Sequence, residues 1–235
     1  MFYKIIQDEK ILKEFIDWLP ELQPTEKFYM CLFARSKYSK NKEGENTLPH
    51  IKSDKAQLKR FVTDKERMFL KIKQLEIQLG WYQQKDLIVP QEVLALYITP
   101  NPREMWRASI RSMVKLAQCI ENENKLMNPH QEVLSEIQRT KSRTCYIDFD
   151  IDAEGEELEK AKSLIPNVVN MDAVTLLQTR GGIHCLIDPN KVQKEFKNKF
   201  WKGMTEIPGV DQTGDGMIPV PGCCQGGFVP HFIQH

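Results

Sequence analysis

Three aspartates occupy alternate positions in one short segment of the chain: Asp148, Asp150 and Asp152. Side chains alternate across a β-strand, so these carboxylates would share one face of a strand and the apolar residues between them the other. Carboxylates about 7 Å apart along a strand repel one another, and a hard divalent cation such as Mg²⁺ or Mn²⁺ removes that repulsion. The segment is therefore a candidate metal-binding strand. The alternative is a half-exposed strand edge that its charges protect against pairing.

A glycine turn followed by a histidine forms a second candidate group. Thr179, Arg180 and Gly182 belong to a Thr-Arg-Gly-Gly turn, and His184 follows two residues later. Glycine permits positive φ and close approach by a phosphate, and a guanidinium can bind phosphate oxygens bidentately. These residue types predict contacts with a polyphosphate. The alternative is a satisfied, partly buried histidine beside a surface arginine.

A third carboxylate would complete a two-metal site, because such a site needs acidic residues from more than one element to hold ions about 4 Å apart. The sequence offers Asp211, which follows an apolar residue, and Asp215, which lies in Gly-Asp-Gly. Gly-Asp-Gly is also ordinary turn chemistry. Asp211 is therefore the preferred third ligand, with Asp215 as the alternative.

The elements that must position these residues follow from apolar spacing and from proline and glycine punctuation. Helices are predicted over 8–19, from Ser53 to residue 79, over 104–121, 129–139 and 154–164, and around Val192, Phe196 and Phe200. Strands are predicted over 27–34, 92–99, 143–152 and 173–178, with a polar loop over 36–49 and a turn at 179–182 that leads into a paired strand over 183–187. This order indicates an α+β fold with helices on one face of the sheet. We expect a single domain, 1–235, in which 1–140 packs against 141–235.

The composition narrows the class of protein. The chain has 235 residues and a net charge of +1, so charge alone gives no general attraction to nucleic acid, although 35–73 is a basic stretch. The six cysteines form no C-x-x-C pair, which argues against a zinc ribbon or a thioredoxin-type motif. No apolar run reaches the roughly 18 residues of a membrane span. These features predict a cytoplasmic protein with free thiols and no membrane partner.

The order of these motifs resembles that of the archaeo-eukaryotic primase superfamily, in particular its phage- and plasmid-borne primase-polymerases. The likeness rests on apolar-Asp-x-Asp at residues 147–150, Gly-Ile-His at 182–184, Val-Asp at 210–211 and Pro-Val-Pro-Gly at 219–222. It implies an RRM-like antiparallel catalytic sheet beside an N-terminal α/β portion. It also implies that a nucleic-acid template and nucleoside triphosphates are bound, with a replicative helicase as a possible partner in trans.

For the active site, the resemblance implies that Asp148, Asp150 and Asp211 hold Mg²⁺ or Mn²⁺. It implies that His184, with Arg180, Thr179 and Gly182 nearby, binds the incoming nucleotide. Two other functions are compatible with the same residues. One is a catalytically silent RRM-like module that binds nucleic acid, and the other is a metal-dependent phosphoesterase in which His184 serves as a base.

Overall fold

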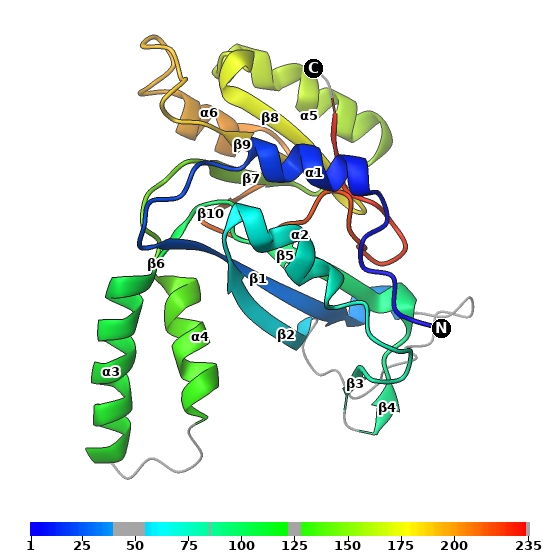
Figure 1. Cartoon of the computed structure of the whole chain (residues 1–235). Coiled ribbons are helices and arrows are strands. Elements are labelled where there is room, and N and C mark those ends of the chain that lie inside the picture. Colours follow the sequence, from blue (N-terminus) through cyan, green and yellow to red (C-terminus); the bar gives the residue numbers. More distant parts are fainter. Residues whose placement is uncertain (40–54, 85, 122–127, 234–235) are drawn as a thin grey trace.

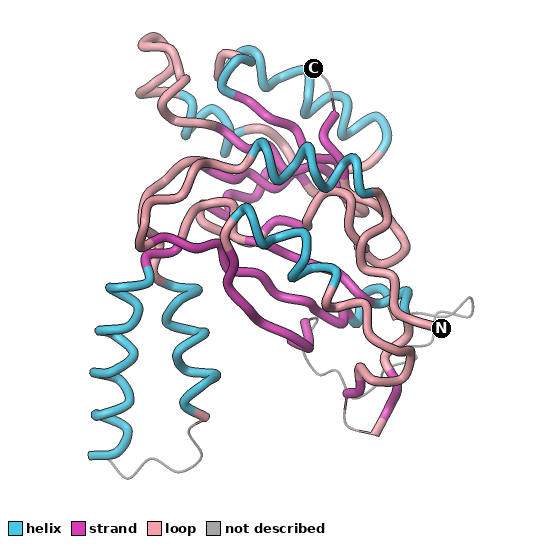
Figure 2. The backbone as a smooth tube through the Cα atoms, viewed as in Figure 1, coloured by secondary structure: helices cyan, strands magenta, loops and turns pink. Residues whose placement is uncertain are grey.

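The computed structural model describes residues 1–39, 55–84, 86–121 and 128–233 (Figure 1). These residues form a mixed α+β structure with six α-helices and antiparallel sheets, as the sequence predicts. Two five-stranded sheets carry most of the structure, and helices lie at the top, in the middle and at the lower left of the view in Figure 2. Nowhere in the described ranges is a helix both long and apolar enough to cross a membrane.

The first sheet is built mainly from the N-terminal half of the chain. Its strands have the order β11-β5-β1-β2, and β6 also pairs with β1. Their bounds are β1 Glu26–Arg35, β2 Lys55–Thr63, β5 Leu94–Ile98, β6 Arg103–Glu104 and β11 Ile218–Pro219. β1 and β5 are buried almost throughout, which their continuous apolar runs explain. Because β11 comes from the C-terminal part, the two halves of the chain share this sheet.

The second sheet contains the acidic strand as an inner strand, with a neighbour on each side. Its order is β10-β7-β9-β8-β12, and all neighbours are antiparallel. The strands are β7 Ile147–Ile151, β8 Val174–Thr179, β9 Gly182–Ile187, β10 Val210–Gly214 and β12 His231–Ile233. Helix α5, Gly155–Val168, connects β7 to β8, and helix α6, Phe200–Glu206, precedes β10. The sequence of elements is therefore strand, helix, strand, strand, helix, strand.

The two faces of the second sheet pack differently. On one face, apolar side chains of β7, β8 and β9 form a core with α5 and α6. On the other face, Leu177 and Leu186 belong to a larger core that includes the first sheet. In Figure 1, α5 and α6 lie at the top, with the first sheet below. The acidic face of β7 therefore points away from the helices that cover the sheet.

Four helices and a small hairpin complete the structure. They are α1 Glu9–Trp18, α2 Lys65–Lys73, α3 Met105–Glu121, α4 Pro129–Arg139 and the β3–β4 hairpin, Gln83–Gln84 with Leu87–Ile88. Short 3-10 turns lie at Ser36–Tyr38, Gln91–Val93 and Met171–Ala173. Helices α3 and α4 form a hairpin that projects from the body (Figure 1).

The prediction of one long helix from Ser53 to residue 79 is wrong at both ends, because α2 covers only Lys65–Lys73. Residues Lys55–Thr63 form β2, which pairs with β1 along its length, and Ser53 lies outside the described residues. The helix begins only at Lys65, because the Asp64 side chain accepts a hydrogen bond from the Arg67 backbone N–H and caps it. Cross-strand pairing with a buried strand decides the conformation here, and local apolar spacing does not reveal it.

The helix predicted around Val192 and Phe196 begins later, at Phe200. Side chains bind the backbone before that point: Asp188 Oδ1 accepts from Asn190 N at 2.9 Å, and Asn170 Oδ1 accepts from Gln193 N at 2.9 Å. Such bonds stabilise turns in competition with a helix. Much of the predicted polar loop over 36–49 lies outside the described residues, which include only its first turn.

Candidate functional site

Three strands bring the predicted acidic and histidine residues into one row. Asp150 on β7 is the register partner of Asp211 on β10 and of His184 on β9. Residues directly opposite each other in antiparallel strands project from the same face. Phe149, between the aspartates, is fully buried in the core under α5 and α6. The alternation predicted from the sequence is therefore confirmed, and the three side chains occupy the face opposite that core.

Asp148 and His184 form a buried pair beside Asp150. The Nδ1 atom of His184 lies 2.9 Å from Asp148 Oδ1 and 3.1 Å from Oδ2, so the ring donates its Nδ1–H to this carboxylate. The Nε2 atom lies 3.8 Å from Asp150 Oδ1. His184 is 7% exposed and Asp148 1% exposed, which shields the pair from solvent. The imidazole thus lies between two carboxylates of one strand.

These contacts shift the pKa values of His184 and Asp150. Burial lowers the pKa of His184, but the charge and hydrogen bond of Asp148 and the charge of Asp150 outweigh it, so the net pKa lies above 6.5. Burial raises the pKa of Asp150, the His184 ring opposes that change, and the charges of Asp152 and Asp148 add to it. The charged imidazolium of His184 is therefore more favourable than that of a free histidine. The ionised form of Asp150 is less favourable than that of a free aspartate, because the His184 charge does not fully offset burial and the neighbouring carboxylates.

The donor chemistry of this face fits a hard divalent cation. Asp148, Asp150 and Asp211 offer only carboxylate oxygens, the ligands that Mg²⁺ and Mn²⁺ prefer. Asp211 is exposed and Asp150 is partly exposed, so both are accessible from solvent. Within the described ranges, no three or more His, Cys, Asp or Glu side chains are already gathered as a metal-binding group. Asp152 is also exposed, and it lies just past the end of β7.

Three cations surround the Tyr38 ring, and the sequence motifs had included only one of them, Arg180. The guanidinium of Arg180 lies 4.4 Å from the centre of the Tyr38 ring, Arg35 lies 5.6 Å from it, and the Lys37 ammonium 5.5 Å. The charge of Lys37 also lowers the pKa of Asp150, which places it near the carboxylates. For Arg35 and Lys37, the signal in the sequence was that a basic stretch begins at Arg35. We call Arg35, Lys37 and Arg180 the Tyr38 cation cluster.

The glycine turn contributes to this cluster through Arg180, and its other residues hold the turn together. The Thr179 hydroxyl donates to the Gly182 carbonyl at 3.1 Å. Gln225 Oε1 accepts from the Arg180 backbone N–H at 2.9 Å, and the Arg180 guanidinium donates to the Gly226 carbonyl. The structure thus gives Thr179 and Gly182 a direct role in the shape of the turn, and directs the Arg180 side chain toward Tyr38.

Gly182 also has a packing reason to be glycine. Its φ is +148°, and a Cβ atom at this position would collide with the Ile151 carbonyl oxygen. The absence of a side chain lets β9 approach the end of β7 closely. The sequence assigned this glycine to phosphate approach, and the structure shows that it allows two strands of the site to meet.

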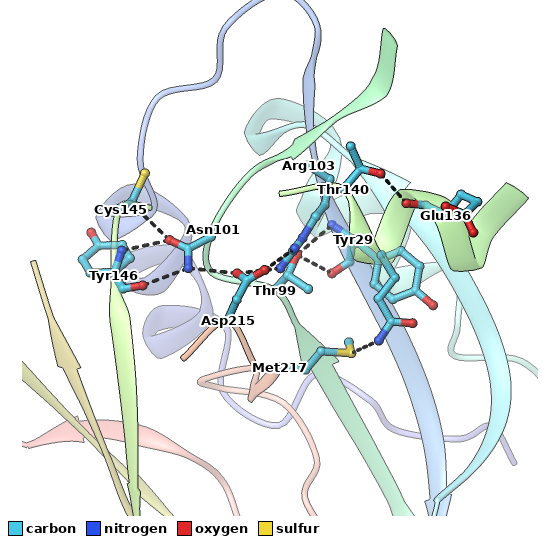
Figure 3. Close-up of polar contacts among 11 residues, drawn as sticks. Tyr29, Thr99, Asn101, Arg103, Glu136, Thr140, Cys145, Tyr146, Asp215 and Met217 are labelled. Atoms are coloured by element: carbon cyan, nitrogen blue, oxygen red, sulfur yellow. Dashed lines mark hydrogen bonds and ion pairs between the residues drawn. The ribbon is translucent and has the colours of Figure 1, made fainter. Parts of the chain in front are cut away.

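Asp215, the alternative third ligand, belongs to a different network (Figure 3). Its carboxylate accepts from Arg103 Nη1 at 2.5 Å, from Arg103 Nη2 at 2.9 Å and from Asn101 Nδ2 at 3.0 Å. The Asn101 amide also bonds the chain just before β7: its Oδ1 accepts from Cys145 N and Tyr146 N, and its Nδ2 donates to the Tyr146 carbonyl. The Asp215 carboxylate therefore links the segment after β10 to the entry of β7.

Arg103 is 1% exposed and is the largest fully buried side chain in the described part of the chain. A buried guanidinium needs a carboxylate partner, and Asp215 provides one in bidentate geometry. We call Arg103, Asn101 and Asp215 the β6 clamp. It joins the first sheet to both acidic strands of the second, so its effect on Asp148, Asp150 and Asp211 is to position the strands that carry them.

Comparisons with known proteins add no assignment to this site. No protein-family model, no curated protein and no solved structure matches the chain.

Proposed function

We propose that this protein is a metal-dependent nucleotidyltransferase, a primase-polymerase that makes or extends primers on a nucleic-acid template. The observation that carries the proposal is the row Asp211–Asp150–His184 across three adjacent strands, with Asp148 bound to the same histidine. Phosphoryl transfer depends on positioning and charge neutralisation, and this row combines two exposed or partly exposed carboxylates with a cationic ring.

The topology of the second sheet supports an RRM-like assignment within this proposal. From β7 to β10 the elements follow the order strand, helix, strand, strand, helix, strand, and the strands lie in the order β10-β7-β9-β8. This is the split βαβ arrangement of RRM-like and ferredoxin-like domains. The acidic strand β7 is an inner strand of this sheet, between β10 and β9.

The residues divide into two roles. Asp148, Asp150 and Asp211 would hold Mg²⁺ or Mn²⁺, which neutralises phosphate charge and activates the attacking hydroxyl. The Tyr38 cation cluster and the imidazolium of His184 would bind the triphosphate of the incoming nucleotide. Lys37 and Arg180 both contact the Tyr38 ring, and the charge of Lys37 lowers the pKa of Asp150, so this cation acts on a carboxylate of the row. The adjacency matches a substrate that carries both phosphates and a bound metal.

The geometry disfavours one of the two alternatives. A phosphoesterase with His184 as its base stays an alternative, because a carboxylate on Nδ1 and a raised pKa also suit a general base. A silent RRM-like module would stack bases on exposed aromatic residues of its sheet, whereas Phe149 is fully buried on the opposite face.

The test is template-dependent synthesis. The wild-type protein, a single-stranded template, labelled nucleotides and Mg²⁺ or Mn²⁺ should give labelled product. The double variant Asp148→Ala with Asp150→Ala should give none, and Asp17→Ala should remain active because Asp17 is an exposed carboxylate on α1. Synthesis that persists in the double variant, or a wild-type protein that makes no product with either metal, would contradict the proposal.

A further inference from the structure

Helix α3 has an apolar stripe on the side that faces away from α4. Ala108 and Ser112, on its inner side, are 0% and 4% exposed. The residues of the outer stripe are all exposed, at 70% for Trp106, 49% for Ile110, 69% for Met113 and 78% for Ile120, with Ala117 also exposed. Figure 1 shows the α3–α4 hairpin projecting from the body. The stripe therefore lies on a free-standing part of the molecule.

The spacing of the stripe is that of a helix-pairing seam. Its residues follow one another at intervals of four, three, four and three, the a/d pattern of a heptad repeat. A helix that only needs to pack on α4 requires a single apolar face, and α3 already has one on its inner side. Helix α3 is 17 residues long, and its second apolar face has heptad spacing, which indicates another helix as the partner.

The charges beside the seam select that partner. Arg107 near the start of α3 and Glu121 at its end lie on the same flank of the stripe, because they are fourteen residues apart in a heptad pattern. In two antiparallel copies of α3 that cross at Val114, Arg107 of each copy lies beside Glu121 of the other. In a parallel pair, this flank faces the opposite flank of the partner helix, so Arg107 and Glu121 would not meet. The charges of this flank are thus complementary between two copies of α3 only when the helices are antiparallel.

We propose that the α3 stripe is a self-association surface through which two copies of this chain pair by antiparallel packing of α3 on α3. A two-fold axis through Val114 makes the contact isologous, so that one apolar patch serves both copies. The contact is a single pair of helices and is small for a protein interface, so the dimer forms at micromolar concentration and dissociates on dilution. The pairing leaves the acidic row and the β6 clamp untouched.

Sedimentation equilibrium of the full chain tests the proposal. At concentrations up to about 100 µM, where a micromolar contact is occupied, the wild-type mass should rise from 27.4 kDa toward twice that value. Met113→Glu should hold the mass at that of one chain, since it places a charge in the seam. Leu70→Glu is the matched control, because Leu70 is 64% exposed on α2, and it should leave the dimer intact.

Charge reversal distinguishes self-pairing from a general apolar surface. Arg107→Glu and Glu121→Arg should each weaken the dimer, because each places like charges together, and the two together should restore it. Circular dichroism of every variant shows whether it is folded. A wild-type protein that stays at the mass of one chain throughout would overturn the proposal. So would a folded Met113→Glu variant that still dimerises, or a double reversal that remains as weak as either single variant.

Discussion

Replacing Asp215 with alanine tests whether this residue holds the fold or a metal. The carboxylate accepts two hydrogen bonds from Arg103 and one from Asn101. Its removal leaves the Arg103 guanidinium, 1% exposed, without its carboxylate. A buried charge that loses its partner costs about 3–5 kcal/mol, and we take about 3 kcal/mol because the Asp215 side chain is itself 28% exposed to screening solvent.

This loss should be visible in thermal and chemical unfolding. For a chain of this size, about 3 kcal/mol corresponds to a decrease in Tm of roughly 6–12 °C. Urea unfolding with EDTA present measures the free energy directly and excludes any contribution of a metal. Glu14→Ala is the control: Glu14 is paired with Lys10 at 3.9 Å, both side chains are largely exposed, and its loss should cost no more than about 0.5 kcal/mol.

The opposite result has a clear meaning. A carboxylate that serves as a metal ligand is repelled by its neighbours when no metal is bound, so its replacement leaves stability in EDTA unchanged or higher. If Asp215→Ala unfolds with the same free energy as the wild-type protein in EDTA, the β6 clamp does not stabilise the fold, and Asp215 becomes the better candidate for the third ligand.

Two further predictions concern the central strands. The His184 ring should titrate in NMR with a midpoint above pH 6.5, and Asp148→Asn should lower that midpoint. The pair stabilises the fold fully below pH 6.5, and this contribution is lost as the pH rises through the folded-state pKa. A midpoint below pH 6.5 contradicts the pairing. Gly182→Ala should cost about 2 kcal/mol or more, because its Cβ meets the Ile151 carbonyl oxygen, whereas Gly181→Ala, whose nearest neighbour is 3.9 Å away, should be tolerated; equal stability of the two variants would refute the packing argument.

The acidic strand and the hairpin could be predicted from sequence because their patterns are local. Alternation of aspartate with apolar residues has a period of two, and a Gly-Gly turn between apolar runs specifies a hairpin. That Asp150 would lie opposite His184 follows from strand register, which the sequence suggested only through the order of the motifs.

Other features depend on contacts between distant segments. β2 looked helical because Leu58, Phe61 and Val62 fit a helical spacing, and its pairing with β1 overrides that preference. Lys37 approaches Asp150 from a turn more than one hundred residues earlier in the chain, so no local pattern could include it in the site. The partnership of Arg103 with Asp215 likewise joins two segments that a reader of the sequence has no reason to pair.

The central claim is that the carboxylates of β7 serve nucleotide transfer. The most direct test is the rate of nucleotide incorporation on a single-stranded template by Asp150→Asn, which keeps the size of the side chain and removes its charge. We expect a loss of at least about 100-fold, equivalent to ~2.7 kcal/mol of transition-state stabilisation, with the fold intact. A folded Asp150→Asn variant that incorporates nucleotides at the wild-type rate would contradict the account.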